Sequence, residues 1–386
     1  MAEGTTEIQK KQPELLPMAP PAGGCWPTQT GAQGGRPRLD QPFVAGSLDT
    51  PAGKVPMVSS SLAWKDQWGA FKVRWGIGRM NYSVDPGLYA LGEPNSSSPV
   101  LVTANYKLSF DRLRQALPNR RAWILVLDTK GINVWCAAGK GTFGTGELVE
   151  RIRASSLEQV VNHRDLILPQ LAAPGVAAHE VKKASGFRVI YGPIRSGDLA
   201  AFLDNGRKAS AEMRRKTFTL GERAVLIPIE LVAGLKHSLF VLPVFFLLGG
   251  LGSGAGFWAN AMTHGLFAAL IFLGVVMAGT ILTPLLLPFL PGRAFTSKGL
   301  SLGILGALLF LAFWGAGRPT WSGRLEMLAW IFLVPAITAF LAMDFTGAST
   351  YTSLSGVRKE MRWGVPLEIG LGSLGLILWI GGRFLA

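Results

Sequence analysis

"SPVLVTANYKLSFDRLRQALPNRRAWILVLD", residues 98–128, holds two short apolar runs on either side of an amphipathic segment. The runs 98–104 and 122–128 are rich in aliphatic and β-branched residues and are bounded by turn residues, which predicts two strands. The segment 108–117 between them predicts a helix. Strand, helix and strand in this order favour a parallel pair of strands with the helix covering one face of the sheet.

The same alternation continues to about residue 206. Further strands are predicted at 165–170 and 187–192, and further helices at 146–155, 177–185 and 196–206. In a parallel sheet the loops that follow the strands meet at one edge, and ligands bind there. We therefore expect a Rossmann-like α/β domain over residues 61–206, with one rim formed by the loops after its strands.

Two segments of different composition flank this domain. Residues 1–60 are rich in Pro, Gly, Ser and Gln, so too little apolar surface is available to offset the entropy of ordering, and we expect a disordered tail. Cys25 lies in this tail and is interpreted as an incidental exposed thiol. Residues 207–223 carry many Lys and Arg residues and predict a basic juxtamembrane connector.

The remaining residues, 224–386, predict an all-α membrane domain with five transmembrane helices. The spans are expected at about 236–253, 261–287, 299–316, 325–344 and 364–384. Each is near the roughly 20 residues that cross a bilayer. Arg and Lys residues concentrate in the loops after the second and fourth spans, so the positive-inside rule places the N-terminal domain in the cytoplasm. The first residues also lack the apolar core of a signal peptide. The sequence thus predicts a multi-pass protein of the cytoplasmic membrane, in contact with lipid.

Composition narrows the classes of function. The formal net charge is +14, yet charged residues make up 16% of the chain and apolar residues 49%. A nucleic-acid-binding protein would instead gather its basic residues on a polar domain, so we expect no nucleic-acid partner. The two cysteines lie far apart in the sequence, which gives neither a disulfide framework nor a zinc motif. A reducing compartment is therefore expected for Cys136.

Cys136 stands in "NVWCAAGK", residues 133–140, between a predicted strand and a predicted helix. Asn133 is a good helix N-cap, and a helix that begins there places Cys136 in its first turn, where the helix dipole favours a thiolate. The small residues 137–139 would leave a flat surface beside the sulfur, which suits a planar metal macrocycle. From the residues alone, Cys136 is a metal or cofactor ligand, a reactive thiol or a structural thiol.

A glycine pattern offers another interpretation. "GKGTFG", residues 139–144, satisfies G-x-G-x-x-G, which binds nucleotides when it follows a strand directly. Here about ten residues separate the pattern from the end of the predicted strand at Asp128. A transporter or receptor subunit that binds a nucleotide through Gly139, Gly141 and Gly144 remains the alternative from a different class.

Several stretches resemble known corrinoid proteins. Residues 133–140 resemble the cap-helix signature of the corrinoid proteins of microbial mercury methylation. Residues 98–114, 166–175 and 187–199 resemble the corrinoid-binding part of the corrinoid iron–sulfur protein of the acetyl-CoA pathway. The likeness runs from about residue 73 to the C-terminus, because the mercury family also joins this domain to a five-span membrane anchor. The cysteine cluster that holds the iron–sulfur centre of the acetyl-CoA pathway relative is not seen here.

The resemblance implies a cobalamin-type corrinoid, a cap helix beneath it, and the Cys136 thiolate as lower axial ligand of cobalt. It further implies a corrinoid-dependent methyltransferase that transfers a methyl group from methyl-Co(III) to Hg(II), forming methylmercury. A thiolate is a strong donor, and a strong donor opposite the methyl group weakens the cobalt–carbon bond. The expected cofactor-binding residues are Asn133, Val134, Trp135, Cys136, Ala137, Ala138, Gly139 and Lys140, with rim positions Thr142, Gly144, Thr145, Gln170, Gly175, Tyr191 and Gly192.

The resemblance also implies partners. A ferredoxin-like protein with two [4Fe–4S] clusters would supply electrons, and a folate-type carrier or its methyltransferase would supply the methyl group. A membrane-bound corrinoid methyl carrier of acetyl-CoA or one-carbon metabolism is the first alternative function, and the nucleotide-binding transporter subunit is the second.

Overall fold

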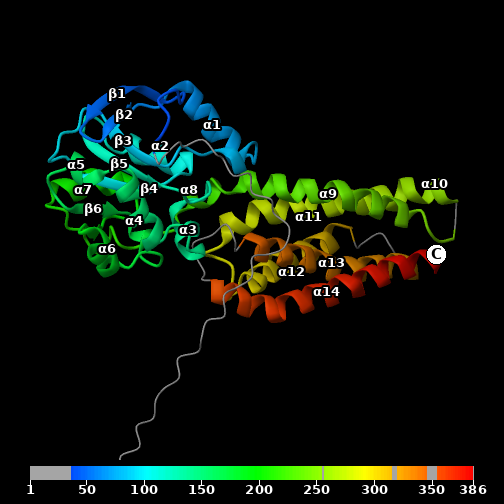
Figure 1. Ribbon diagram of the computed structural model, residues 1–386. Coiled ribbons are helices and arrows are strands. Elements are labelled where there is room, and N and C mark those ends of the chain that lie inside the picture. The colour runs from blue at the N-terminus through cyan, green and yellow to red at the C-terminus, as the bar shows by residue number, and fades with distance from the viewer. Residues whose placement is uncertain (1–35, 254–255, 315–319, 346–353, 386) are drawn as a thin grey trace, which may run out of the picture.

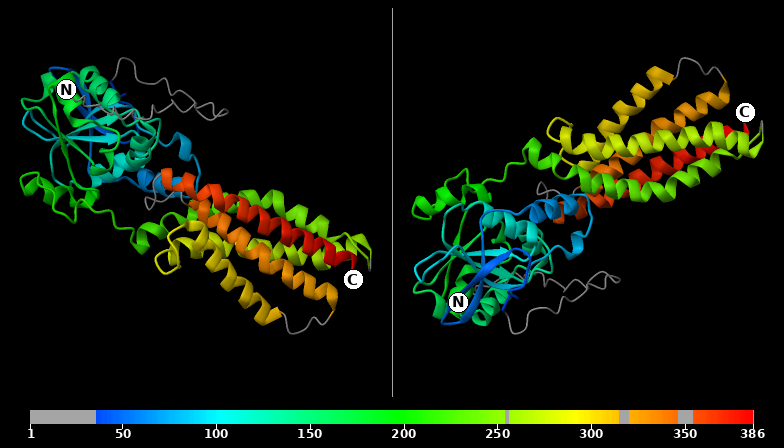
Figure 2. Two further views of the ribbon diagram at one scale, coloured as in Figure 1. Left: turned by 90° about the horizontal axis from the view of Figure 1, so that it is seen from below. Right: turned by 90° about the horizontal axis from the view of Figure 1, so that it is seen from above.

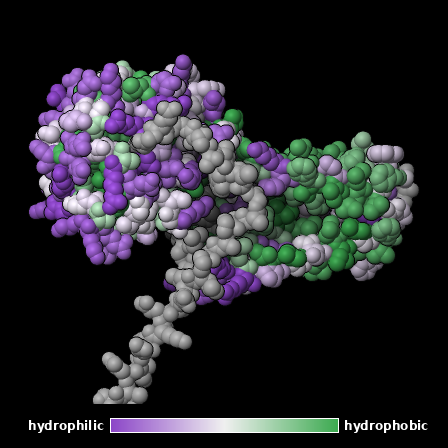
Figure 3. All heavy atoms as spheres, viewed as in Figure 1, coloured by the Kyte–Doolittle hydropathy of each residue, from purple (hydrophilic) through white to green (hydrophobic). Residues whose placement is uncertain are grey.

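The computed structural model describes residues 36–253, 256–314, 320–345 and 354–385. It consists of an α/β domain at one end and a bundle of long helices at the other (Figure 1). Hydrophilic residues cover the visible face of the α/β domain, and hydrophobic residues cover the bundle (Figure 3). Cys25 and most of the expected tail lie outside the described residues.

The α/β domain is built on a seven-stranded sheet with the order β1-β2-β3-β5-β4-β6-β7. The strands are β1 Val44–Thr50, β2 Gly53–Val58, β3 Gly87–Leu91, β4 Val100–Ala104, β5 Ala122–Leu127, β6 Asp165–Leu168 and β7 Arg188–Tyr191. Strands β5, β4, β6 and β7 are parallel neighbours, as the sequence predicted. Strand β3 runs antiparallel to β5, so the sheet as a whole is mixed.

The expectation of a disordered tail over residues 1–60 is wrong for its last part. Strands β1 and β2 form an antiparallel hairpin, and β2 pairs with β3 at the edge of the sheet. Val55 and Val58 are buried there. The Gly and Pro content of the segment concealed this alternation of apolar and polar residues, which is the pattern of a strand with one face on a core. Strand β3 was not predicted either, although all five of its residues are buried.

Helices cover both faces of the sheet. They are α1 Trp64–Arg74, α2 Lys107–Gln115, α3 Val134–Lys140, α4 Thr145–Ala154, α5 Leu157–Val160, α6 Ala178–Ser185 and α7 Leu199–Asp204, with short 3-10 turns η2 Arg79–Asn81, η3 Gln170–Ala172 and η4 Ser196–Asp198. Successive side chains of β5 point to opposite faces: Trp123 and Leu125 join the core under α4 and α6. Ile124 and Val126 join the core under α2 and α7.

The bundle contains five helical stretches, within the described residues, that are long and apolar enough to cross a membrane: Leu220–Gly249, Phe257–Leu286, Phe295–Phe313, Trp321–Asp344 and Gly356–Phe384. They comprise α8 Leu220–Ala224, α9 Ile227–Gly249, α10 Phe257–Asn260, the π-helical segment η5 Ala261–Gly265, α11 Leu266–Leu286, α12 Phe295–Trp314, α13 Trp321–Asp344 and α14 Leu354–Phe384. The predicted number of spans agrees. The first stretch begins at Leu220 rather than near residue 236, because the preceding apolar residues continue the same helical stretch.

A buried charge network fastens α1 to α2. Arg114 is 1% exposed, and its Nη2 lies 2.7 Å from Asp66 Oδ2 while its Nε lies 2.9 Å from Asp111 Oδ1. Lys107 Nζ lies 2.6 Å from Asp66 Oδ1 and 2.7 Å from Asp111 Oδ2. Burial alone would raise the pKa of Asp66, but the hydrogen bonds from Lys107 and Arg114 outweigh it, so this pKa is lowered.

Replacing Arg114 by Met should destabilise the α/β domain by about 3–5 kcal/mol, because two buried carboxylates would lose their main partner. Chemical denaturation of the purified full-length protein measures this loss. The matched control is Arg120→Met, which removes an exposed pair with Asp204 and should leave the free energy of unfolding nearly unchanged. Equal effects of the two substitutions would contradict the role of the network.

The lowered pKa of Asp66 also predicts a pH dependence of stability. A carboxyl whose pKa is lower in the folded than in the unfolded state stabilises the protein above its ordinary pKa, and this contribution is lost as the pH falls. The difference in free energy of unfolding between the wild type and Asp66→Asn should therefore shrink as the pH falls from about 6 to about 3. A difference that stays constant over this range would contradict the prediction.

Candidate functional site

A cavity of about 440 Å³ lies at the carboxyl edge of the parallel strands. Thr103 at the end of β4 and Cys136, Pro169 and Gly192 after β5, β6 and β7 all line it. The rim predicted from the loops after the strands is therefore confirmed. This edge is where open α/β sheets bind ligands, and the volume is within the range of small-molecule sites.

The opposite wall of this cavity comes from the membrane domain. Val225 and Leu226, which follow α8, and Ile229 in the first turn of α9 line it. The two domains also touch beside the cavity, since a Cβ on Gly76 would lie 3.1 Å from Cδ1 of Ile229. Figure 2 shows α1 beside the ends of the long helices that face the α/β domain. The cavity is thus a junction between the two domains, which the sequence did not predict.

Helix α3 carries Cys136 into this cavity. Asn133 has the extended backbone of an N-cap, and its Oδ1 accepts a hydrogen bond of 3.0 Å from the N–H of Cys136, as predicted. Cys136 is partly exposed, and Val134 and Trp135 line the cavity beside it. The cap and the first turn of the helix therefore fix the direction of the thiol.

The loop before α3 is held by a buried asparagine. Asn105 follows β4 and is 6% exposed, and its Oδ1 accepts hydrogen bonds from the N–H groups of Thr129 at 3.1 Å and Gly131 at 3.0 Å. Lys130 and Gly131 both have positive φ, so the chain turns sharply here. The side chain of Asn105 substitutes for backbone partners that the turn removes from these N–H groups.

The inner face of α3 packs against the loop after β6. A Cβ on Gly175 would lie 2.2 Å from the carbonyl oxygen of Phe143 and 3.0 Å from Cα of Ala138, so a glycine is needed for this approach. Ala137 and Ala138 are buried in the sheet core. The prediction that residues 137–139 form a flat surface beside the sulfur is therefore wrong for the two alanines. They face inward, because α3 must close the core above β4 and β5.

The structure divides the expected site residues into two groups. Those that line the cavity are Asn133, Val134, Trp135, Cys136 and Gly192. Those that do not line it are Ala137, Ala138, Gly139, Lys140, Thr142, Gly144, Thr145, Gln170, Gly175 and Tyr191. Their roles toward a cofactor stay predictions.

Several residues of the second group hold the loops around the site. Tyr191 Oη donates a hydrogen bond of 2.7 Å to the carbonyl oxygen of Val176. The N–H of Ala177 donates one of 2.9 Å to Thr145 Oγ1. Gly139 and Lys140 are exposed at the end of α3. These contacts support the loop after β6 without placing the side chains in the cavity.

The glycine pattern 139–144 has a structural role. Gly139 lies inside α3, Gly141 ends that helix with a φ of 79°, and Gly144 is the N-cap of α4. A helix rather than a strand therefore precedes the pattern. The geometry that a nucleotide-binding glycine loop requires is not met, which disfavours the transporter alternative.

The sequence analysis missed the polar residues on the far side of the cavity. Arg74 of α1, Arg112 of α2 and Tyr106, the N-cap of α2, line it. Tyr106 is the second residue after the strand 98–104, so its position on the rim was a usable signal. Arg74 could not be found in this way, because the fold of α1 onto α2 depends on the buried network around Arg114.

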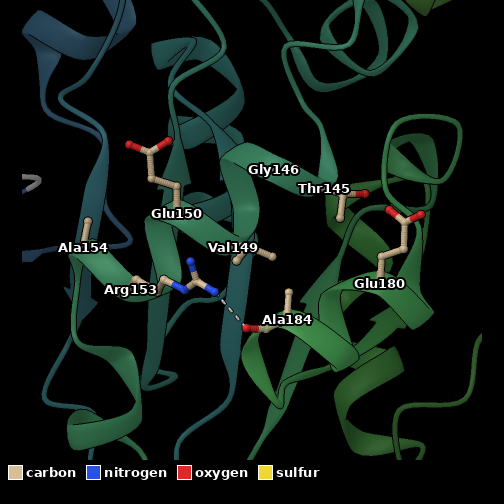
Figure 4. A pocket seen from close by; sticks show the side chains of 8 residues that line it. All are labelled: Thr145, Gly146, Val149, Glu150, Arg153, Ala154, Glu180 and Ala184. Carbon is tan, nitrogen blue, oxygen red and sulfur yellow. Dashed lines mark hydrogen bonds between the residues drawn. The ribbon is translucent and has the colours of Figure 1, made fainter.

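A second, more open groove lies between α4 and α6 on another face of the domain (Figure 4). Arg153 reaches across it and donates a hydrogen bond of 3.1 Å to the carbonyl oxygen of Ala184, while Glu150 and Glu180 lie on opposite sides. Thr145 is the one expected site residue in this groove. It lacks both a cysteine and the carboxyl end of a strand, so we place the functional site at the cavity that contains Cys136.

Within the described ranges, no three His, Cys, Asp or Glu side chains gather in a way that could hold a metal ion. Cys136 is also the one such residue among those that line the cavity. The site therefore presents a single soft donor atom within apolar walls, such as Leu101 and Leu171, instead of a complete set of metal ligands.

The part of the α/β domain that contains Cys136 is similar to known proteins. Residues 77–203 match the model of the CO dehydrogenase/acetyl-CoA synthase delta subunit family. Similar curated proteins include gamma subunits of the acetyl-CoA decarbonylase/synthase complex. That of Archaeoglobus fulgidus is 33% identical over 128 residues, and that of Methanopyrus kandleri is 39% identical over 124 residues.

These similarities cover a limited part of each protein. The two alignments cover 33% and 31% of this chain, and 27% and 26% of the relatives. The chain thus spans about a quarter of the length of the curated relatives it matches. The matched region contains β3 to β7 and the α3 helix, but it ends before the five apolar helices. The similarity to these subunits is therefore confined to the α/β domain.

Replacing Gly175 by Ala should destabilise the protein by about 1–3 kcal/mol and displace α3, because the new methyl group would overlap Phe143 O. Thermal unfolding measures the stability, and the rate of maleimide labelling in a Cys25→Ser background reports the position of Cys136. The control is Gly139→Ala in α3, where a Cβ meets nothing within 4 Å. It should be neutral or stabilise by about 0.5–1 kcal/mol. Unchanged stability and labelling in Gly175→Ala would contradict this account.

Proposed function

We propose that the α/β domain binds a cobalamin-type corrinoid in the Cys136 cavity and serves methyl transfer in one-carbon metabolism. One observation carries this proposal: the domain matched to acetyl-CoA synthase subunits places a single thiol at the carboxyl edge of its parallel strands. The local likeness of residues 133–140 to corrinoid cap helices supports the same cofactor.

The residues around the cavity fit such a cofactor. Tyr106 Oη is buried and has no hydrogen-bond partner among the described residues, and its side chain lines the cavity. Gln170 Oε1, next to the lining residues Pro169 and Leu171, is likewise buried without such a partner. Buried polar groups need partners, and the amide side chains around a corrin ring offer both donors and acceptors. The apolar wall suits the ring itself.

A bound corrinoid would supply a cobalt ion that can carry a methyl group. The Cys136 sulfur would hold the cobalt, because a thiolate is a strong, soft donor toward a transition metal. Binding of the metal would keep that sulfur deprotonated. The Asn133 cap and the loop held by Asn105 would keep the donor atom in place.

Two acceptors for the methyl group are open to test. The similarity to acetyl-CoA decarbonylase/synthase subunits favours a methyl carrier of one-carbon metabolism. The local likeness of residues 133–140 to the mercury-methylating corrinoid proteins favours Hg(II) as the second candidate. The Cys136 thiolate supports that candidate, because a strong donor favours release of methyl with its bonding electrons to a soft electrophile.

The proposal includes partners and a location. A ferredoxin-like protein with two [4Fe–4S] clusters would supply electrons, and a folate-type donor or its methyltransferase would supply the methyl group. The five apolar helices would cross the cytoplasmic membrane, and the α/β domain would lie on its cytoplasmic side. The cavity would then open close to the membrane surface, where α9 begins.

Anaerobically purified full-length protein loaded with cobalamin should show a sulfur–cobalt charge-transfer absorption, which Cys136→Ala should lose. Cys25→Ser is the matched control and should keep this absorption. The same band in Cys136→Ala would refute the axial thiolate.

A second experiment supplies the loaded protein with methyl donor, reductant and Hg(II), and formation of methylmercury would identify the second acceptor. A methylated corrinoid without methylmercury would favour the carrier.

A further inference from the structure

Positive charge gathers at the mouth of the Cys136 cavity. Arg74, Arg79, Arg112, Arg195 and Lys216 line it, and none of its lining residues within the described chain is acidic. These cations come from α1, η2, α2 and the segments that precede η4 and α8. Lys216 belongs to the basic segment 207–223, and the tertiary fold brings the four arginines beside it.

Two of the five cations have a carboxylate partner. Lys216 Nζ lies 2.6 Å from Glu222 Oε1, and Arg195 Nε lies 3.9 Å from the same atom. Glu222 is in α8, on the membrane-domain side of the cavity. This side of the mouth is therefore partly neutralised.

The other three cations lack such a partner. Within 4.0 Å of Arg74, Arg79 and Arg112, the described residues provide no carboxylate oxygen. Arg79 lies 6.0 Å from the centroid of the Tyr106 ring, and it interacts with Glu230 of α9 only through longer-range electrostatics. Arg112 is exposed and reaches Gln115 at 3.5 Å.

Arg74 shows the cost of this arrangement. Its Nε is buried without a hydrogen-bond partner among the described residues, although the guanidinium is a strong donor. Burial, and then the positive charge of Arg112, lower the pKa of Arg74. Grouped guanidinium groups and an unused buried donor are unfavourable alone, and an anion between them would relieve both.

We propose that Arg74, Arg79 and Arg112 bind a phosphate ester at the mouth of the Cys136 cavity. Planar guanidinium groups suit phosphate oxygens, because each presents paired N–H donors. Two molecules could bring this group. One is the corrinoid itself, whose nucleotide tail contains a phosphodiester, and this source rests on the proposed function. The other is a phospholipid headgroup, because Val225 and Ile229 of the membrane domain border the same cavity.

The first arm of the test compares two corrinoids with detergent-solubilised full-length protein. Cobinamide lacks the nucleotide tail of cobalamin and its phosphodiester. The wild type should bind cobalamin about tenfold or more tightly than cobinamide. Arg74→Gln combined with Arg112→Gln should lose this preference while keeping the affinity for cobinamide, both followed by the change in visible absorption. Arg153→Gln, in the groove between α4 and α6, is the matched control and should behave as the wild type.

The second arm tests the lipid source without a corrinoid. Short-chain phosphatidic acid should raise the thermal unfolding temperature of the wild type more than short-chain diacylglycerol, which lacks the phosphate, and the double variant should lose this difference. A response in this arm alone assigns the site to lipid. Arg112→Gln alone, at an exposed position, guards against misfolding of the double variant and should weaken the response in whichever arm is positive.

The outcomes separate the two proposals. A wild type that binds neither corrinoid contradicts the proposed function, while the lipid arm still decides the phosphate site. If the wild type and the double variant show equal cobalamin preference and equal lipid response, the phosphate site is refuted even where the corrinoid binds.

Discussion

The hydrogen bonds to the side chain of Asn105 hold the loop on which the rest of the site depends. Its Oδ1 accepts from the N–H groups of Thr129 and Gly131 and thereby fixes the turn between β5 and α3. Helix α3 has seven residues, which is too short to be stable alone in water. It exists because Asn133 caps its start and because Gly175 lets its inner face approach the core. The place of the Cys136 sulfur is therefore set by tertiary contacts at both ends of one short helix.

Tertiary contacts also form the cavity where the two domains meet. The edge of a parallel sheet leaves a hollow between its loops, and here the first turn of α9 closes that hollow from the other side. A buried network on α1 and α2 brings Arg74 to the same place. The cavity thus combines an apolar wall, a single thiol and a group of cations, and these come from segments that are distant in the sequence.

Local patterns predicted the parts of the fold that depend on local physics. The runs 98–104 and 122–128 became neighbouring parallel strands, because buried strands need continuous apolar residues. The five apolar stretches appeared in the expected number, and Asn133 became the predicted cap. The hairpin of β1 and β2 was missed because its Gly and Pro residues resemble those of a loop. It is stable because β3 offers an edge on which it can pair.

The site residues that come directly after strands could be predicted from the sequence. Those that reach the cavity through tertiary packing could not. Cys136 and Gly192 lie after strands, so topology alone brought them to one rim. Ala137 and Ala138 belong to the same short segment, but the helix turns them into the core. Ile229 and Arg112 reach the cavity through contacts between domains and between helices, and no spacing in the sequence records such contacts.

The contact between Gly76 and Ile229 has a consequence for how molecules reach the sulfur. It joins the α/β domain to the start of a helix that is long enough to span a bilayer. The α/β domain is therefore held against the membrane domain by packing as well as by the connecting segment. With that helix in a membrane, the entrance of the Cys136 cavity would keep a fixed distance from the lipid surface and a fixed orientation toward it. Any partner protein that docks at this entrance must then approach along the membrane surface, and its own surface must match that geometry.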